Sequence, residues 1–133
     1  METRTVNMET RKLPIRFVAD TDEKRARGLM FASPLSDDEV ALFVFPRSDR
    51  YAFWNKNVSF GLSLAFLDEN RRVVDFADMD AHSADRVEPR ADARYVVEAS
   101  RGTWDRLGVQ RGDIIDYEDH ALHIKTARST RSG

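Results

Sequence analysis

The sequence predicts a mainly β protein, a β-rich α+β chain folded as a compact barrel-like or sandwich-like single domain with two short helices. Short apolar runs separated by turn residues recur along the chain, and only two segments carry helix start and stop signals. A length of 133 residues with 41% hydrophobic positions suits one domain. We expect this domain to span residues 13–125, between a flexible N-terminal segment (1–12) and a flexible C-terminal tail (126–133), because both ends are polar and aperiodic.

The first half of the chain predicts three strands and one helix. The apolar runs at residues 13–19 and 40–45 indicate strands, and the second is closed by Pro46. Between them, DTDEKRARG offers an Asp or Thr N-cap, acidic residues in the first turn and Gly28 as a terminator, which predicts a short helix. Residues 51–60, YAFWNKNVSF, are expected to form the third strand.

The second half predicts a hairpin, a strand, a second short helix and a closing strand pair. The hairpin covers residues 62–79 with its turn at Asp68 to Arg71, and the strand covers residues 94–99. SRGTWDRLG predicts the helix, and two strands follow around a turn at Glu118 and Asp119. The polar residues 80–93 lack periodicity, so we expect a long, mobile surface loop there; such loops are uncommon unless they bind or cover something.

Composition and missing motifs exclude several function classes. The net charge of -2 provides no broad cationic field, so we expect no nucleic-acid partner. The absence of cysteine excludes disulfides, thiolate nucleophiles and cysteine-ligated metals. His120 and His123 would point to opposite faces of a strand, so we expect no metal site, and no phosphate loop, dinucleotide fingerprint or nucleophile elbow indicates a cofactor.

The sequence contains no apolar run approaching the ~18 to 20 residues that would span a bilayer. Its N-terminus, METRTVNMETRKLPIRF, also lacks the apolar core of a signal peptide. As written, the chain is expected to be a soluble cytoplasmic protein.

One charged residue interrupts each of two apolar segments. In a strand, Trp54 and Lys56 of AFWNKN would share one face, and Glu98 interrupts YVVEAS in the same way. Because an isolated buried charge is costly, each residue predicts the other as its partner, and we expect a Lys56–Glu98 ion pair. This pair could fix the arrangement of the strands, or it could belong to a ligand site whose walls include Trp54 and Arg27.

Five motifs resemble, in order and spacing, the prokaryotic family called domain of unknown function 192. They are VADTDEKRARGLMF, LFVF, FWNKN, YVVEASRG and GVQRGD, and they lie between Ile15 and Ile115. The resemblance implies a compact, mostly β, barrel-like domain without an established activity, in a family whose members frequently carry an export or lipoprotein leader. The chain departs from the family pattern where Asn55, Val58, Gly61 and Ser63 replace methionine, threonine, proline and aspartate.

These observations favour a non-enzymatic binding module for a small polar or anionic ligand. Its pocket is expected to contain Trp54, Lys56, Asn57, Glu98 and Arg27, with the loop at residues 80–93 beside it. One alternative is a small enzyme that uses Lys56 and Glu98 as an acid–base or electrostatic pair on a small polar or anionic substrate. The other is a structural or partner-docking domain, which would need an exposed apolar patch instead of a pocket.

Overall fold

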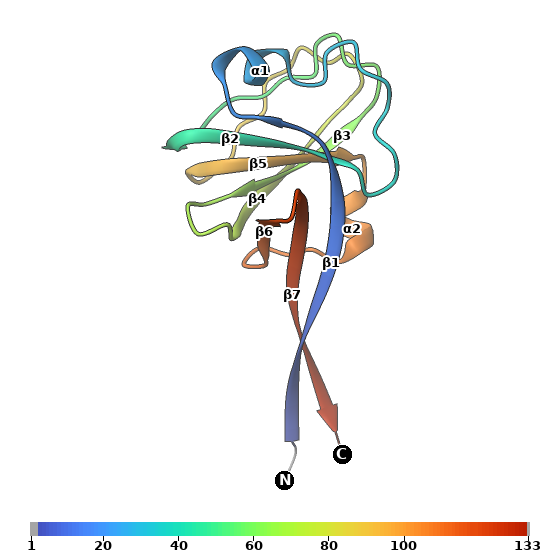
Figure 1. The fold of residues 1–133 in the computed structure, drawn as a ribbon, viewed down its shortest axis with the longest axis vertical. Helices are drawn as coiled ribbons and strands as arrows, with labels where there is room; N and C mark the ends of the chain where they lie inside the picture. Colours follow the sequence, from blue (N-terminus) through green and yellow to red (C-terminus); the bar gives the residue numbers. More distant parts are fainter. Residues whose placement is uncertain (1–2, 133) are drawn as a thin grey trace.

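The computed structural model describes residues 3–132 and places the side chains of residues 11–125 (Figure 1). This part of the chain contains seven strands and two short helices. Their bounds are β1 Thr3–Ala19, α1 Asp22–Arg27, β2 Val40–Asp49, β3 Leu62–Leu67, β4 Val73–Met79, β5 Ala93–Ser100, α2 Thr103–Leu107, β6 Ile114–Glu118 and β7 Ala121–Ser132. The mainly β fold with two short helices that the sequence predicts is therefore confirmed.

All seven strands join one curled sheet, in the order β4-β3-β5-β2-β1-β7-β6. β1 and β2 run parallel, and the other neighbouring strands are antiparallel. The two edge strands approach each other, because Arg72 forms a bridge with Ile114 and the Val73 amide donates a 2.8 Å hydrogen bond to the Asp113 carbonyl. The sheet is thus a half-barrel, from which β1 and β7 extend together toward the two termini (Figure 1).

The ends of the chain are paired as strands. β1 and β7 form an antiparallel ladder that begins with Thr3 opposite Ser132. Residues 3–12 and 126–132, which we expected to be flexible ends, therefore have extended, hydrogen-bonded backbone, and residues 1, 2 and 133 lie outside the described residues. The mobility of these ends in solution, and the domain bounds drawn from it, stay predictions.

Two buried clusters lie on opposite faces of the curled sheet. One cluster contains Leu42, Val97 and Ile115 and packs against α2, whereas the other contains Phe43 and Val96 and lies toward α1. Because side chains alternate along a strand, β5 contributes to both clusters. All six residues of β3 are buried, as expected for a strand covered on both faces.

The helix α1 forms where the start and stop signals predict it. Thr21 is the N-cap, and its hydroxyl accepts a 3.1 Å hydrogen bond from the Lys24 amide. Asp22 and Glu23 occupy the first turn, where negatively charged carboxylates interact favourably with the positive end of the helix dipole. Gly28 ends the helix with a φ of 50°, a backbone conformation that glycine adopts without strain.

The prediction of a strand at residues 51–60 is wrong. Phe53 makes one isolated bridge to Val87, and the chain then turns at Lys56 and Asn57, where Asn57 has a left-handed φ of 62°. Asparagine tolerates this conformation better than most residues, whereas aromatic residues raise the strand propensity of the segment as a whole. The alternation that placed Trp54 and Lys56 on one strand face therefore does not apply.

The segment between β4 and β5 is a loop, as predicted, and it is anchored to the segment at residues 51–60. Phe53 and Val87 exchange two backbone hydrogen bonds of 2.8 Å each, and the Asn55 amide donates to the Ser83 carbonyl at 2.9 Å. At the other end of the loop, Arg90 donates to the buried carboxylate of Asp75 at 2.8 Å. The loop has more anchors than its sequence indicates, and its mobility stays a prediction.

Candidate functional site

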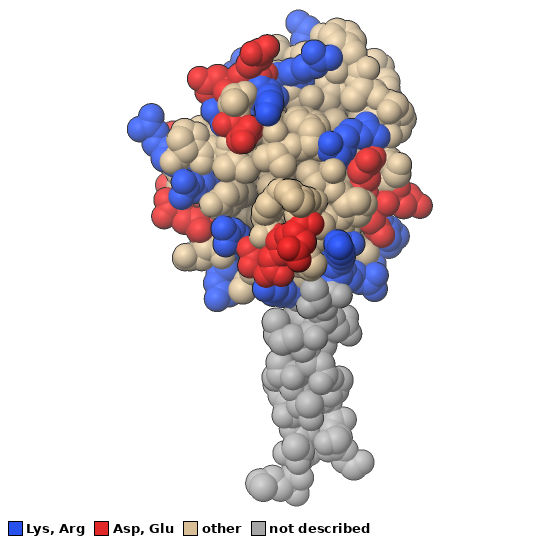
Figure 2. All heavy atoms as spheres, in the orientation of Figure 1, with Lys and Arg blue, Asp and Glu red and all other residues tan. Residues whose placement is uncertain are grey.

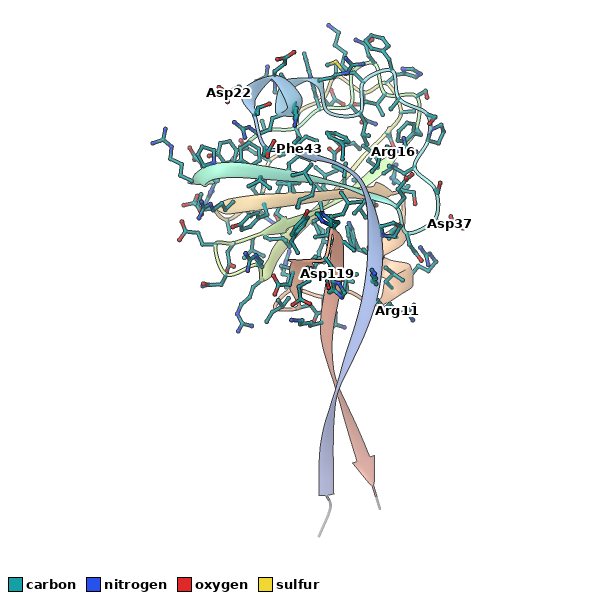
Figure 3. The ribbon with its side chains drawn as sticks, viewed as in Figure 1. Arg11, Arg16, Asp22, Asp37, Phe43 and Asp119 are labelled. Atoms are coloured by element: carbon teal, nitrogen blue, oxygen red, sulfur yellow. The ribbon has the colours of Figure 1, made fainter. Side chains whose placement is uncertain are left out.

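Four elements enclose a pocket of about 290 Å³, which we call the Glu98 pocket. They are the C-terminal end of α1 with the residues just after it, β2, the segment at residues 51–58 and the C-terminal half of β5. Figure 3 places Phe43 in the layer between β2 and α1, on the side of the sheet where this pocket lies. The pocket is lined by Arg25, Ala26, Arg27, Gly28, Leu29, Met30, Phe43, Phe45, Tyr51, Ala52, Phe53, Trp54, Asn55, Lys56, Val58 and Glu98.

Glu98 is a buried acid in the middle of the sheet. Its neighbours in register are Ala41 of β2 and Leu64 of β3, neither of which has a polar side chain. The residue is 4% exposed, and no described residue forms a hydrogen bond or an ion pair with its carboxyl group. Burial raises the pKa of Glu98 to about 8. The carboxyl group is therefore mostly protonated at neutral pH and can donate a hydrogen bond.

Aromatic side chains form much of the pocket wall. The Phe43 and Phe53 rings meet edge to face with their centroids 5.4 Å apart, and Phe45 stacks on Tyr51 at 3.7 Å. Arg25 lies over the Phe45 ring at 5.3 Å and donates hydrogen bonds to the Val44 carbonyl and the Asp22 carboxylate. These contacts fix the aromatic wall and leave Arg25 with a carboxylate partner.

Cations lie at the exposed side of the pocket. The Lys56 Nζ is 5.3 Å from the centroid of the Trp54 ring, over which Arg86 also lies at 5.5 Å. Trp54 is 39% exposed, so it is accessible as well as part of the wall. Neither Lys56 nor Arg27 has a carboxylate oxygen within 4.0 Å among the described residues. The mouth of the pocket thus carries two cations without an acidic partner.

The prediction of an ion pair between Lys56 and Glu98 is wrong. Both residues line the Glu98 pocket, but no contact within 4.0 Å joins their charged groups. The reason is the turn at Lys56 and Asn57, which brings the ammonium group to the Trp54 ring instead of the sheet. Glu98 instead avoids an isolated charge by holding its proton.

The structure brings together four of the five residues that the sequence indicated for the site. Arg27, Trp54, Lys56 and Glu98 line one pocket, whereas Asn57 does not. The Asn57 carbonyl accepts a 2.9 Å hydrogen bond from the Phe31 amide, which ties the turn to the segment after α1.

Asn55 is a pocket residue that the sequence reasoning missed. Its side chain is fully buried, and its Nδ2 donates to the carbonyls of Phe60 at 2.9 Å and Asp80 at 3.0 Å. Its Oδ1 is buried without a hydrogen-bond partner among the described residues. An amide in an otherwise aromatic run was the available signal, but the assumed strand directed it away from Lys56.

Ser63, which stands where the family resemblance implies an aspartate, lies outside the Glu98 pocket. Its hydroxyl donates to Asp78 Oδ1 at 2.6 Å and accepts a 3.0 Å hydrogen bond from the Gly102 amide. These bonds connect β3 to β4 and to the start of α2. The geometry indicates a structural role for this serine.

The sequence matches one known family over most of its length. The profile of the family DUF192, described as uncharacterized ACR, matches residues 3–117. The chain belongs to this family. A UPF0127 protein of Thermococcus gammatolerans is 35% identical over 106 residues, which are 76% of this chain and 65% of that relative. This chain therefore spans about two thirds of the length of that relative.

Solved structures share the fold of this DUF192 protein. A protein of unknown function from Novosphingobium aromaticivorans superimposes with a TM-score of 0.73 and 28% identity, over 77% of this chain and 75% of that one. A protein from Sinorhizobium meliloti, described only provisionally as a transcription regulator, gives a TM-score of 0.72 over 94% of both chains. Its identity of 21% shows a common fold and no more.

Neither helix in residues 3–132 has the length and apolar character needed to cross a bilayer. No three His, Asp or Glu side chains among the described residues gather in a group that could hold a metal ion. On the face shown in Figure 2, blue and red groups interleave over the body of the protein.

Proposed function

We propose that this DUF192 protein is a small-molecule binding module and that the Glu98 pocket takes an organic ligand bearing an anionic group. The observation that carries this proposal is the Glu98 carboxyl group, which is buried in the wall of a cavity and has no partner in the described part of the protein. Buried polar groups almost always have hydrogen-bond partners, so an unpaired one beside a cavity favours a ligand.

The size and lining of the pocket support a small ligand. A cavity of about 290 Å³ lies at the lower end of the usual range for ligand pockets. Phe43, Phe53 and Trp54 offer apolar and aromatic surface, and the Glu98 carboxyl group is a polar group without a partner among the described residues. This combination of an apolar wall and a few polar groups is typical of metabolite sites.

The anionic group is inferred from the mouth of the pocket. Lys56 and Arg27 have no carboxylate partner in the described structure, so a ligand carboxylate or phosphate would gain charge-assisted hydrogen bonds there. Glu98 is mostly protonated near neutral pH and therefore adds little opposing charge.

An enzyme remains the second candidate, because the pKa of Glu98 is about 8. A carboxyl group that exchanges its proton near the operating pH suits general acid–base catalysis. A binding module and an enzyme differ in one observable: an enzyme converts a bound compound during prolonged incubation, and a binding module returns it unchanged.

Titration of the 15N-labelled protein with butyrate, benzoate, 3-phenylpropanoate and inorganic phosphate tests the proposal. We expect at least one anion to shift the amide signals of Phe43, Phe53 and Asn55 in a saturable manner. Lys56→Gln should weaken that binding at least about tenfold, whereas Lys12→Gln, an exposed site on β1 outside the pocket, should leave it unchanged. Saturable shifts that avoid these amides, or equal binding by Lys56→Gln, would contradict the proposal.

A further inference from the structure

We infer that the ligand of the Glu98 pocket is a zwitterion of amino-acid size, whose ammonium group pairs with Glu98 and whose carboxylate lies against Lys56 and Arg27. This inference rests on the proposed function and specifies the chemistry of its ligand. It follows from two unmatched sets of charged groups in one cavity, a single acid at the sheet and two cations at the mouth.

The acid is the first half of the argument. No described donor reaches the Glu98 carboxyl group, although the pocket contains three cationic side chains. Arg25 is held by Asp22 and by the Val44 carbonyl, and Lys56 is turned toward Trp54. Arg27 makes no contact with Glu98 either, so none of the described cations completes this site, whereas a ligand ammonium group would supply the hydrogen bonds as well as the charge.

The aromatic wall favours an ammonium group over a neutral hydrogen-bond acceptor. Phe43 and Phe53 line the same cavity as the carboxyl group, and aromatic rings attract cations through their electron-rich faces. The protein already uses this interaction at the pocket, where Arg25 lies 5.3 Å from the centroid of Phe45 and Lys56 lies 5.3 Å from that of Trp54. An acid combined with aromatic rings is the chemistry by which proteins recognise amines.

The mouth of the pocket is the second half of the argument. To reach Glu98, a simple amine would have to pass Lys56 and Arg27, whose positive charges repel it. Neither of these residues has a carboxylate partner among the described residues. A simple carboxylate would satisfy these cations but leave Glu98 unpaired. A molecule with an ammonium group and a carboxylate would pair with Glu98 at one end and with the two cations at the other. The pocket volume of about 290 Å³ limits this molecule to a small metabolite.

The pH dependence of binding follows from the same geometry. Charged or titratable groups in the pocket besides Glu98 are Arg25 and Arg27 from α1 and Tyr51 and Lys56 from the segment after β2, whereas the partners of Glu98 in register, Ala41 and Leu64, carry none. Glu98 of the free protein holds a proton at neutral pH, and a bound ammonium group would displace it. Affinity for a zwitterion should therefore rise between pH 6 and about pH 8, the pKa that burial gives Glu98.

The test compares ligands that share a carbon skeleton and differ only in charge. Calorimetric titrations would use phenylalanine with 3-phenylpropanoate and 2-phenylethylamine, and 4-aminobutyrate with butyrate and butylamine. In at least one set, the zwitterion should bind at least about tenfold more tightly than either singly charged compound. Glu98→Gln, which keeps the shape of the side chain, should remove that advantage, and Glu88→Gln, at an exposed position in the loop before β5, should retain it.

The outcomes separate this inference from the proposed function. If a carboxylate-only compound binds as tightly as its zwitterion, or if zwitterion affinity falls as the pH rises from 6 to 8, the ligand is an anion and the inference is wrong while the proposed function stands. If no compound of either set binds, and the anion titration of the labelled protein also gives no saturable shift, both are wrong. Should Glu98→Gln fail to fold, the sign of the pH dependence in the wild-type protein decides the question.

Discussion

Lys56 and Glu98 line the same pocket without contacting each other: the ammonium group lies 5.3 Å from the centroid of the Trp54 ring, and the carboxyl group has no partner among the described residues. Two opposite charges in one cavity would ordinarily pair, which would lower the pKa of the acid. Here the pKa of Glu98 is raised to about 8 by burial. We therefore place the proposed ligand in the space between these two groups.

The free energy of unfolding should depend on pH through Glu98. Folding raises the pKa of this carboxyl group from 4.5 to about 8, so the folded state binds its proton more tightly than the unfolded chain does. Its contribution to stability is fully present below pH 4.5 and is lost as the pH rises through about 8. The loss should be on the order of 3 to 5 kcal/mol. Urea unfolding at several pH values measures it.

Glu98→Gln is the variant that isolates this dependence. Its amide does not titrate, so the difference in unfolding free energy between wild type and variant should change steadily between pH 5 and 8 and remain constant above about pH 9. A difference that stays constant over the whole range would show that Glu98 titrates normally in the folded protein.

Lys56→Met should have little effect on stability. Lys56 is exposed and its described contact is a cation–π interaction with Trp54, so the free energy of unfolding should change by less than about 1 kcal/mol. A buried ion pair would instead cost about 3 to 5 kcal/mol when one partner is removed. Chemical denaturation at pH 7 distinguishes the two values, with Lys12→Met on β1 as the exposed control.

Asn55→Ala should destabilise the protein by about 2 to 3 kcal/mol, because it leaves the carbonyls of Phe60 and Asp80 without their side-chain donor. The bond to Phe60 closes the turn within the segment at residues 51–60, and the bond to Asp80 connects that segment to the start of the loop that follows β4. Asn57→Gly, two positions further on, should change the free energy of unfolding by less than about 0.5 kcal/mol, since glycine accepts the left-handed backbone of that exposed position. Equal losses for both variants would contradict the anchoring role of Asn55.

Amide hydrogen exchange should divide the loop between β4 and β5 into anchored and free positions. The amides of Phe53 and Val87 exchange hydrogen bonds across the two segments, and the His82 amide donates to the Val58 carbonyl. We expect these amides to exchange more slowly than that of Ala84, which is exposed. Uniformly fast exchange would indicate that the loop opens as a whole, as its composition alone suggests.

The strands that pair within the sheet were predictable because their signals are local and repeated. The hairpin of β3 and β4 and the helix α1 each combine an apolar pattern with a turn or cap residue at the required position. The burial of Glu98 was predictable for the same reason, since a single acid interrupts an apolar run in β5.

The arrangement around Glu98 could not be predicted, because it depends on contacts between distant segments. Strand propensity at residues 51–60 is outweighed by the bridge from Phe53 to Val87 and by the turn at Lys56 and Asn57. A sequence pattern assigns residues to faces only if the backbone is known to be extended. Once that assumption fails, the side on which Lys56 lies and the burial of Asn55 follow from tertiary structure alone.

The most direct test of this account is the titration of the Glu98 carboxyl carbon by NMR in protein labelled with 13C-glutamate, with Glu98→Gln to assign the signal. The account predicts a pKa near 8 in the free protein. It also predicts that saturation with the zwitterion that binds most tightly lowers this pKa, because the bound ammonium group favours the carboxylate. A pKa near 4.5 in the free protein would show that the carboxyl group is hydrated or paired, and the central claim would be wrong.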